Sequence, residues 1–307
     1  MFKLKRKQTQ MTKTISIKRP IFQGTATAII TPFKGRDKKI DFTSLGKLID
    51  YQIKNEIDAI TLLGSTGEPS TLTNKEQIEI IKFAIRRINK KTKLIVGAGS
   101  NNTTEVINKC TQFEKLGKID AFLIVTPFYN KCTQSGLIKH FTKIANSIKT
   151  PIILYNVPSR TNVNMLPQTV KTLSKHPNII AIKEASGNLN QIAQIINLCD
   201  PNFYLYSGDD ALTLPAMSLG AKGVISVASN AKPKEMEQLV DLCLNKNFAS
   251  AKKWHYNLLN LFNALSCEVN PIPIKYLLYK QHLIKNILRL PLTPLSKENE
   301  INFNKLI

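Results

Sequence analysis

Eight apolar runs rich in strand-forming residues recur at intervals of about 20–35 residues, starting near residue 25. They cover residues 25–30, 58–63, 93–98, 120–125, 151–155, 179–183, 203–207 and 223–227. Amphipathic, helix-like segments lie between them, such as 42–54, 74–88 and 137–148. Two helix starts carry capping sequences, Thr73 with Glu76 and Asn102 before Glu105. Continuous apolar strands joined by helices predict a parallel sheet covered on both faces.

The number of units decides between the two common parallel folds. Eight units over about 225 residues match a closed (β/α)8 TIM barrel, an α/β fold. An open doubly wound sheet is the alternative, but it usually has fewer strands and a glycine-rich loop after the first. Here the first run continues into Thr31-Pro32-Phe33. We therefore predict a barrel catalytic domain over residues 21–245, with its last helix at 233–245. A C-terminal helical appendage over 246–307 follows, with helices at 248–266 and 274–284.

The first twenty residues carry seven Lys or Arg and no acidic residue. We expect residues 1–20 to be a disordered basic tail, or the product of an upstream start whose true initiator is Met11. A targeting segment is the alternative, because such segments are also basic and poor in acids. The stretch lacks the apolar run of a secretory signal.

The formal net charge of +22 raises the question of an anionic partner. The positive charge is scattered, and only seven of the 43 basic residues are Arg. Nucleic-acid readers use Arg and clustered basic stripes, so we expect no nucleic-acid partner. A binder of anionic polymers remains an alternative, and it would show steeply salt-dependent affinity for DNA. No apolar run reaches the roughly 18 residues of a membrane span, so no membrane partner is expected.

The five cysteines are an odd number without paired short spacing, and the four histidines lie far apart in sequence. These spacings give no disulfide framework and no zinc pattern. We expect a cytoplasmic protein without a metal site.

Polar residues gather where the predicted strands end. They occupy residues 64–68, 126–130, 155–156, 183–184 and 207–210, together with Ser226. Active sites of TIM barrels lie at the C-terminal ends of the strands, so these side chains are expected to converge on one site.

Lys183 ends the apolar run Ile-Ile-Ala-Ile-Lys (179–183). A lysine in that place is desolvated, which disfavours the charged form and leaves an amine that can attack a carbonyl. Most lysines instead lie on a solvated surface. Tyr155 closes the preceding strand, and its phenol could supply the proton transfers that imine formation needs. A tyrosine that only tethers a loop is the alternative role.

Two further segments indicate carboxylate binding. The loop Gly64-Ser65-Thr66-Gly67 offers close backbone approach and adjacent hydroxyls, although an ordinary βα turn has the same composition. Arg160 follows the fifth strand, where its fork-shaped guanidinium suits a carboxylate. A surface salt bridge is the alternative role for this arginine.

Seven motifs follow one another along the chain. They are Gly-Ser-Thr-Gly-Glu (64–68), Thr-Pro-Phe-Tyr-Asn (126–130), Tyr-Asn-Val-Pro-Ser-Arg-Thr (155–161), Ile-Lys-Glu-Ala-Ser-Gly (182–187), Ser-Gly-Asp-Asp (207–210), Gly-Val-Ile-Ser-Val (223–227) and Asn-Pro-Ile-Pro-Ile-Lys (270–275). In this order and at this spacing they resemble the dihydrodipicolinate synthase family, within the pyruvate-dependent class I aldolases. The resemblance runs from about Gly24 to Leu292.

The resemblance implies condensation of pyruvate with L-aspartate 4-semialdehyde to 4-hydroxy-tetrahydrodipicolinate, in diaminopimelate and lysine biosynthesis. Lys183 would form the Schiff base with pyruvate. Tyr155 would move protons in a relay with Ser65 and Tyr129. In the family this last tyrosine reaches into the neighbouring subunit's site, which implies a tight dimer that assembles to a tetramer.

The resemblance also implies the substrate contacts. Thr66 and the backbone at Ile225 would hold pyruvate, and Arg160 would hold the carboxylate of the semialdehyde. Neither a metal nor an organic cofactor is implied, because the lysine imine itself serves as the electron sink.

Ser65 leaves a second activity open. Many family members carry Thr at this position, and Ser also matches N-acetylneuraminate lyase, which shares the lysine chemistry. Another pyruvate-dependent aldolase, such as that lyase or a keto-deoxy-sugar aldolase, is therefore the alternative function. The Pro-Ser-Arg-Thr sequence around Arg160 favours the synthase. A catalytically inactive barrel that serves as a binding protein is a further alternative, which the presence of Lys183, Tyr155 and Tyr129 argues against.

Feedback inhibition by lysine is a separate question. Asn101 and Glu105 match the lysine site of inhibited family members, whereas Gln77 replaces the His or Glu that these often carry. Phe128 stands where a tyrosine hydroxyl is usual. Losing a polar group that meets a ligand costs about 1–3 kcal/mol. We therefore predict weak or absent inhibition, which half-inhibition by millimolar lysine would contradict.

Overall fold

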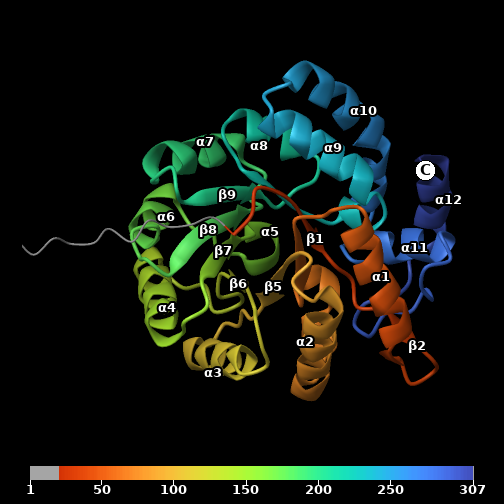
Figure 1. The fold of residues 1–307 in the computed structure, drawn as a ribbon, viewed down its shortest axis with the longest axis horizontal. Coiled ribbons are helices and arrows are strands. Elements are labelled where there is room, and N and C mark those ends of the chain that lie inside the picture. The colour runs from red at the N-terminus through yellow and green to blue at the C-terminus, as the bar shows by residue number, and fades with distance from the viewer. Residues whose placement is uncertain (1–20, 307) are drawn as a thin grey trace, which may run out of the picture.

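The computed structural model describes residues 21–306. Its centre is a closed barrel of eight parallel strands in the order β1-β10-β9-β8-β7-β6-β5-β4 (Figure 1). The strands are β1 (Gly24–Ala28), β4 (Ala59–Leu62), β5 (Lys93–Gly97), β6 (Ala121–Val125), β7 (Ile152–Asn156), β8 (Ile179–Glu184), β9 (Tyr204–Ser207) and β10 (Gly223–Ser226). This arrangement confirms the predicted TIM barrel. Residues 1–20, for which we expect a basic tail or an upstream start, lie outside the described residues.

Helices follow the strands and surround the barrel (Figure 1). They are α1 (Phe42–Lys54), α2 (Asn74–Ile88), α3 (Thr103–Glu114), α4 (Gln134–Ser147), the one-turn α5 (Pro158–Thr161), α6 (Pro167–Leu173), α7 (Leu189–Leu198), α8 (Thr213–Ser218) and α9 (Pro233–Leu244). The bounds of α1 and α2 agree with the sequence pattern. The capping box of α2 is present, because the Glu76 amide donates to Thr73 Oγ1 and the Thr73 amide donates to Glu76.

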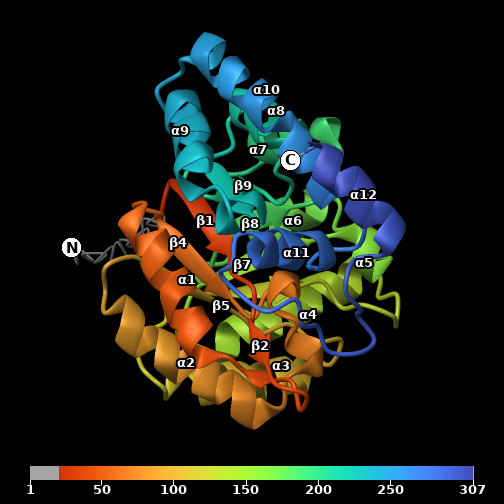
Figure 2. The same cartoon turned by 90° about the vertical axis from the view of Figure 1, so that its right-hand side faces the viewer.

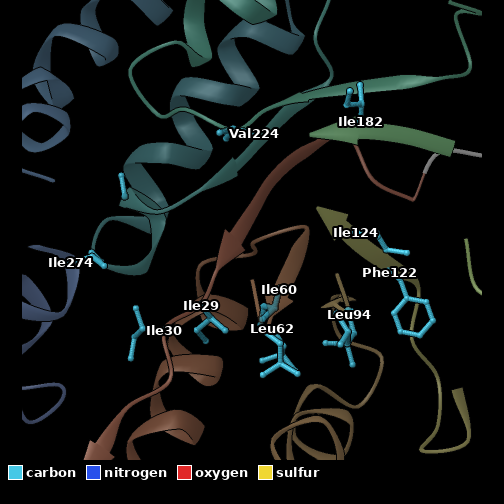
Figure 3. Packing of buried hydrophobic residues seen from close by; sticks show 14 of the residues in the cluster. Ile29, Ile30, Ile60, Leu62, Leu94, Phe122, Ile124, Ile182, Val224 and Ile274 are labelled. Atoms are coloured by element: carbon cyan, nitrogen blue, oxygen red, sulfur yellow. The ribbon is translucent and has the colours of Figure 1, made fainter. Parts of the chain in front are cut away.

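Side-chain alternation along the strands divides the core into two layers. Outward residues such as Leu62, Phe122 and Ile182 pack with the helices in the larger apolar cluster (Figure 3). Inward residues such as Ala26 and Tyr155 form a second cluster inside the barrel. Because successive residues of a strand face opposite sides, Ala181 in this inner cluster places Lys183 on the inner side as well.

The C-terminal region adds three helices outside the barrel units: α10 (Phe248–Leu265), α11 (Ile272–Lys280) and α12 (Lys297–Leu306). Helix α10 packs on α9 and α8, and α12 packs on α10 (Figure 2). The predicted helix at 274–284 was wrong at its C-terminal end, because α11 ends at Lys280 and His282 has a left-handed φ of 59°. The predicted boundary between residues 245 and 246 stays a proposal.

One helix and one pair of short strands did not appear in the sequence pattern. Helix α12 buries only Phe303 and so lacks an apolar stripe. The short antiparallel pair β2 (Phe33–Lys34) and β3 (Lys39–Ile40) is too brief for alternation to be recognised. Within residues 21–306 no helix has the length and apolarity to cross a membrane.

Arg289, in the segment between α11 and α12, fastens the C-terminal region to the barrel. Its guanidinium donates to the Glu76 carboxylate at 2.6 and 2.9 Å, to the Thr71 carbonyl at 2.8 Å and to the Lys38 carbonyl at 2.8 Å. The Arg289 hydrogen bonds are the main cause that lowers the pKa of Glu76 from 4.5 to about 2, against a smaller opposing effect of burial. Folding therefore favours the ionised form of the Glu76 carboxyl group.

This ion pair predicts a loss of stability in acid. A carboxyl whose pKa is depressed by folding stabilises the fold above its unfolded pKa, and that contribution disappears as the pH falls from 4.5 toward 2. Glu76→Gln should keep the capping box but lower the free energy of unfolding by on the order of 2 kcal/mol at neutral pH. The difference from wild type should shrink with acidification in urea unfolding series. A difference that is the same at every pH would contradict the assignment.

Candidate active site

Lys183 and Tyr155 lie side by side inside the barrel. They are direct register partners on β8 and β7, and both are buried, with 5% and 7% of their surfaces exposed. The Lys183 Nζ lies 4.5 Å from the centre of the Tyr155 ring. The sequence prediction required that the Lys183 amine be buried and that it lie near the Tyr155 phenol, and both conditions are met. The structure thus brings together the proposed nucleophile and the phenol.

Gly208, at the end of β9, makes room for the Lys183 side chain. A Cβ at this position would lie 3.0 Å from Lys183 Cε and 2.6 Å from the Cβ of Ala185. Any larger residue would therefore push against the aliphatic part of the Lys183 side chain. The motif Ser-Gly-Asp-Asp was noted in the sequence, but this role of its glycine depends on a contact across two strands.

Behind the pair, Glu184 and Asn156 are the next register partners on β8 and β7. The buried Glu184 carboxylate accepts from Asn156 Nδ2 at 3.0 Å, from the Ser186 amide at 2.7 Å and from Gln191 Nε2 at 3.2 Å. Desolvation raises the pKa of Glu184, although these hydrogen bonds oppose the shift. The network fixes the two strands relative to each other beside Lys183. The sequence placed Asn156 and Glu184 among the polar residues at the strand ends but gave neither an individual role.

A cavity of about 440 Å³ opens at this end of the barrel. Its wall includes Ser65, Tyr155 and Arg160 among the predicted site residues. Thr66, Lys183 and Ile225 are almost fully buried and lie outside the residues that form the wall. The phenol therefore faces the cavity directly, while the amine lies against the phenol ring. The flexible stem of lysine allows the amine to reach the cavity past the ring.

Asn270 connects two of the predicted substrate-binding residues. Its Nδ2 donates to Thr66 Oγ1 at 2.9 Å, and its carbonyl accepts from Arg160 Nη2 at 2.9 Å. The residue precedes α11 in the C-terminal region and lies on the cavity wall. The motif Asn-Pro-Ile-Pro-Ile-Lys was a signal in the sequence, but nothing there showed that the region returns to the mouth of the barrel.

Ile225 lies on β10, inside the barrel, and is 1% exposed. The loop after it is held by Asp210, whose Oδ2 accepts from the amides of Val227 at 3.0 Å and Ala228 at 2.8 Å. Burial raises the pKa of Asp210, and these amides oppose that shift. The ends of β9 and β10 are thus tied together next to the backbone that was predicted to hold pyruvate.

Tyr129 is separated from the other site residues within one chain. Its side chain is 88% exposed, its φ is +75°, and it is not part of the cavity wall. A left-handed φ is strained for a tyrosine, so this backbone conformation persists only because the surrounding loop keeps it. The adjacent Phe128 lines the cavity.

The residues considered for lysine inhibition are engaged within the chain. Gln77 Nε2 donates to the carbonyls of Pro69 at 3.0 Å and Leu72 at 3.2 Å. Glu105 accepts from Ser100 Oγ at 2.7 Å and lies 3.8 Å from the Lys109 ammonium. An external lysine would compete with Lys109 for this carboxylate. Weak or absent inhibition stays a prediction.

Within residues 21–306 no group of three or more His, Cys, Asp or Glu side chains is placed to hold a metal ion.

Comparisons with known proteins agree with this geometry. The Dihydrodipicolinate synthetase family matches residues 21–307. The 4-hydroxy-tetrahydrodipicolinate synthase of Alkaliphilus oremlandii is 47% identical over 287 residues, which covers 94% of this chain and 97% of the relative. The crystal structure of dihydrodipicolinate synthase from Aquifex aeolicus has a TM-score of 0.90 and 42% identity, covering 93% of this chain and 97% of that one.

A monomeric dihydrodipicolinate synthase variant is similar as well, with a TM-score of 0.91 and 37% identity over 93% of this chain and 96% of the variant. The family match extends over the barrel, the cavity and the C-terminal helices together. With its paired lysine and tyrosine at the barrel mouth, the chain belongs to the dihydrodipicolinate synthetase family.

Proposed function

We propose that the chain condenses pyruvate with L-aspartate 4-semialdehyde to 4-hydroxy-tetrahydrodipicolinate through a Schiff base on Lys183. The observation that carries the proposal is the buried Lys183 amine 4.5 Å from the Tyr155 ring, at a cavity whose wall contains the tyrosine. The name of the Alkaliphilus oremlandii relative supports the same activity.

The chemistry follows from these two side chains. The neutral Lys183 amine attacks the keto carbon of pyruvate and forms a carbinolamine. Tyr155 protonates the departing hydroxyl, water leaves, and the C–N bond becomes an imine. Tyr155, now a phenolate, takes a methyl proton and leaves an enamine, whose carbon attacks the aldehyde of the second substrate and turns its oxygen into a hydroxyl. The amino group of the semialdehyde then attacks the imine carbon, closes the ring and releases the Lys183 amine. Ser65, which shares the cavity wall, connects the phenol to the proton relay.

Three groups hold the carboxylates of the substrates. Thr66 and the backbone at Ile225 bind pyruvate; Ile225 belongs to the inner cluster of the barrel, and Thr66 is buried beside Asn270. Arg160 binds the carboxylate of the semialdehyde, since its guanidinium reaches the cavity and is anchored through the Asn270 carbonyl. A planar guanidinium forms two parallel hydrogen bonds to a carboxylate.

The choice of aldehyde is the test of this function. Purified enzyme with pyruvate should consume L-aspartate 4-semialdehyde and leave an N-acetylated amino sugar unchanged. Arg160→Leu should raise KM for the semialdehyde by roughly 10- to 100-fold, with a much smaller change in KM for pyruvate, because a charge-assisted pair is lost. Turnover of the amino sugar instead would favour the alternative lyase.

We also propose that Tyr129 completes the relay of a second copy in a tight dimer, two of which form a tetramer. The exposed ring and strained backbone of Tyr129 support this placement. Two inactive variants test it. Tyr129→Phe and Lys183→Ala, unfolded and refolded together, should recover roughly a quarter of wild-type activity. Mixed dimers then hold one intact site, with Lys183 from one chain and Tyr129 from the other. No recovery would place Tyr129 in its own chain's site.

A cytoplasmic location completes the proposal. The five cysteines are all free in the described structure, as a reducing compartment requires.

A further inference from the structure

A buried ion pair lies directly behind the loop that carries Ser65 and Thr66. The Lys275 ammonium, on α11, donates to Glu68 Oε1, and neither side chain is exposed to solvent. The second carboxylate oxygen accepts from the Arg289 amide at 3.2 Å. Lys275 also donates to the Ile287 carbonyl at 3.2 Å and lies 4.2 Å from the centre of the Phe33 ring. Each member of the pair therefore has a further hydrogen-bond partner in the C-terminal region, Ile287 for Lys275 and Arg289 for Glu68.

Glu68 connects the two short helical turns of this loop. It has a left-handed φ of 52° and lies between two one-turn 3-10 helices, Ser65–Gly67 and Pro69–Thr71. Its amide donates to the Ser65 carbonyl at 3.2 Å, so a displacement of Glu68 is transmitted to the residue that carries the hydroxyl. A strained conformation of this kind persists only when its surroundings hold it in place.

Stability alone is a poor explanation for such a pair. The cost of removing two charges from water often exceeds their attraction, and well-packed neutral residues serve equally well or better. Burial lowers the pKa of Lys275 to about 8, and Glu68 opposes that shift. What the ionic contact adds over an apolar contact is a fixed distance and direction between α11 and the loop.

We propose that Glu68 and Lys275 are positioning residues, through which the C-terminal region sets the place of the Ser65 and Thr66 hydroxyls relative to Lys183. The inference rests on the proposed function of those hydroxyls. It makes the C-terminal helices part of the catalytic unit at two points, because Asn270 holds Thr66 from the same region. Glu68 is one of the residues of the cavity wall, but its carboxylate has no exposed surface and is bound by the Lys275 ammonium and the Arg289 amide. Lys275 is fully buried and does not line the cavity, so neither charged group meets substrate.

Two variants separate positioning from stability. Glu68→Asp keeps both charges but shortens the side chain by one methylene. To keep the ion pair, the loop must then shift relative to α11. Glu68→Gln combined with Lys275→Met removes both charges and leaves no buried unpaired ion. The matched control is Ile144→Ala, a buried position on α4 that lowers stability without contact with the loop.

The measurements are the rate of adduct formation with pyruvate and borohydride in a quenched time course, kcat and KM in the coupled assay, and the melting temperature. All rates are taken well below the melting temperature of every variant. Both Glu68 variants should form the adduct roughly 10- to 100-fold more slowly than wild type, because misplacing catalytic groups by about 1 Å costs this much. The double variant should melt near wild type, whereas Ile144→Ala should melt lower and react at the wild-type rate.

The outcomes are distinct. A double variant that folds and reacts at the wild-type rate overturns the proposal, even where Glu68→Asp fails to fold. If Ile144→Ala reacts as slowly as the Glu68 variants, stability explains the effect and the proposal is again overturned. A wild-type protein that forms no adduct overturns the proposed function as well, which separates that failure from failure of the pair alone.

Discussion

Replacing Lys183 with alanine should abolish the borohydride-trapped adduct with pyruvate and lower kcat by about 10⁴-fold or more. The wild-type protein, treated with pyruvate and borohydride, should gain the mass of one reduced pyruvyl group on the peptide that contains Lys183. The effect is large because the imine is the only electron sink in the proposed reaction. Intact-protein mass spectrometry and peptide mapping measure both outcomes.

Other lysines supply the controls for this experiment. Among the described residues Lys275 is also buried, but its ammonium is occupied by Glu68 and by the Ile287 carbonyl. It should carry no adduct. Lys222 lies 5.9 Å from the Tyr204 ring, just before β10, at the opposite end of the strands. Lys222→Ala should therefore form the adduct as wild type does. An adduct that survives Lys183→Ala would assign the nucleophile to another lysine.

Removing the Tyr155 hydroxyl should slow the reaction by about 10²- to 10⁴-fold while the fold is retained. Tyr155→Phe keeps the ring that packs against the Lys183 amine and loses only the group that moves the proton. KM for pyruvate should change little, because the proposed pyruvate contacts come from Thr66 and Ile225. The adduct should still form, but slowly, since Lys183 remains.

Tyr204 is the matched tyrosine for that variant. It lies in the same inner cluster with 8% exposure, and its hydroxyl accepts from Gln23 Nε2 at 2.8 Å, remote from the cavity wall. Tyr204→Phe should leave kcat near wild type. If both variants lose activity equally, the loss comes from disturbed packing inside the barrel, and this result would contradict a proton-transfer role for Tyr155.

The site illustrates how far strand periodicity carries a prediction. The runs ending at Tyr155 and Lys183 were recognisable because each strand is continuous and apolar, and a closed parallel barrel brings all such ends to one mouth. Because β7 and β8 are neighbours in the barrel, Tyr155 and Lys183 come to lie directly opposite each other. The short pair β2–β3 and helix α12 escaped because neither shows a full period of apolar residues.

The sequence by itself determined the barrel, the choice of Lys183 and Tyr155 as the candidate reacting pair, and the family resemblance, because these depend on local patterns repeated along the chain. Only the tertiary structure decided which distant groups support the site: Gly208 beside Lys183, Asn270 against Thr66, and Lys275 against Glu68. The residues of the last two contacts lie 204 and 207 positions apart. Contacts over such separations depend on how the C-terminal helices fold back over the barrel, which no local pattern encodes.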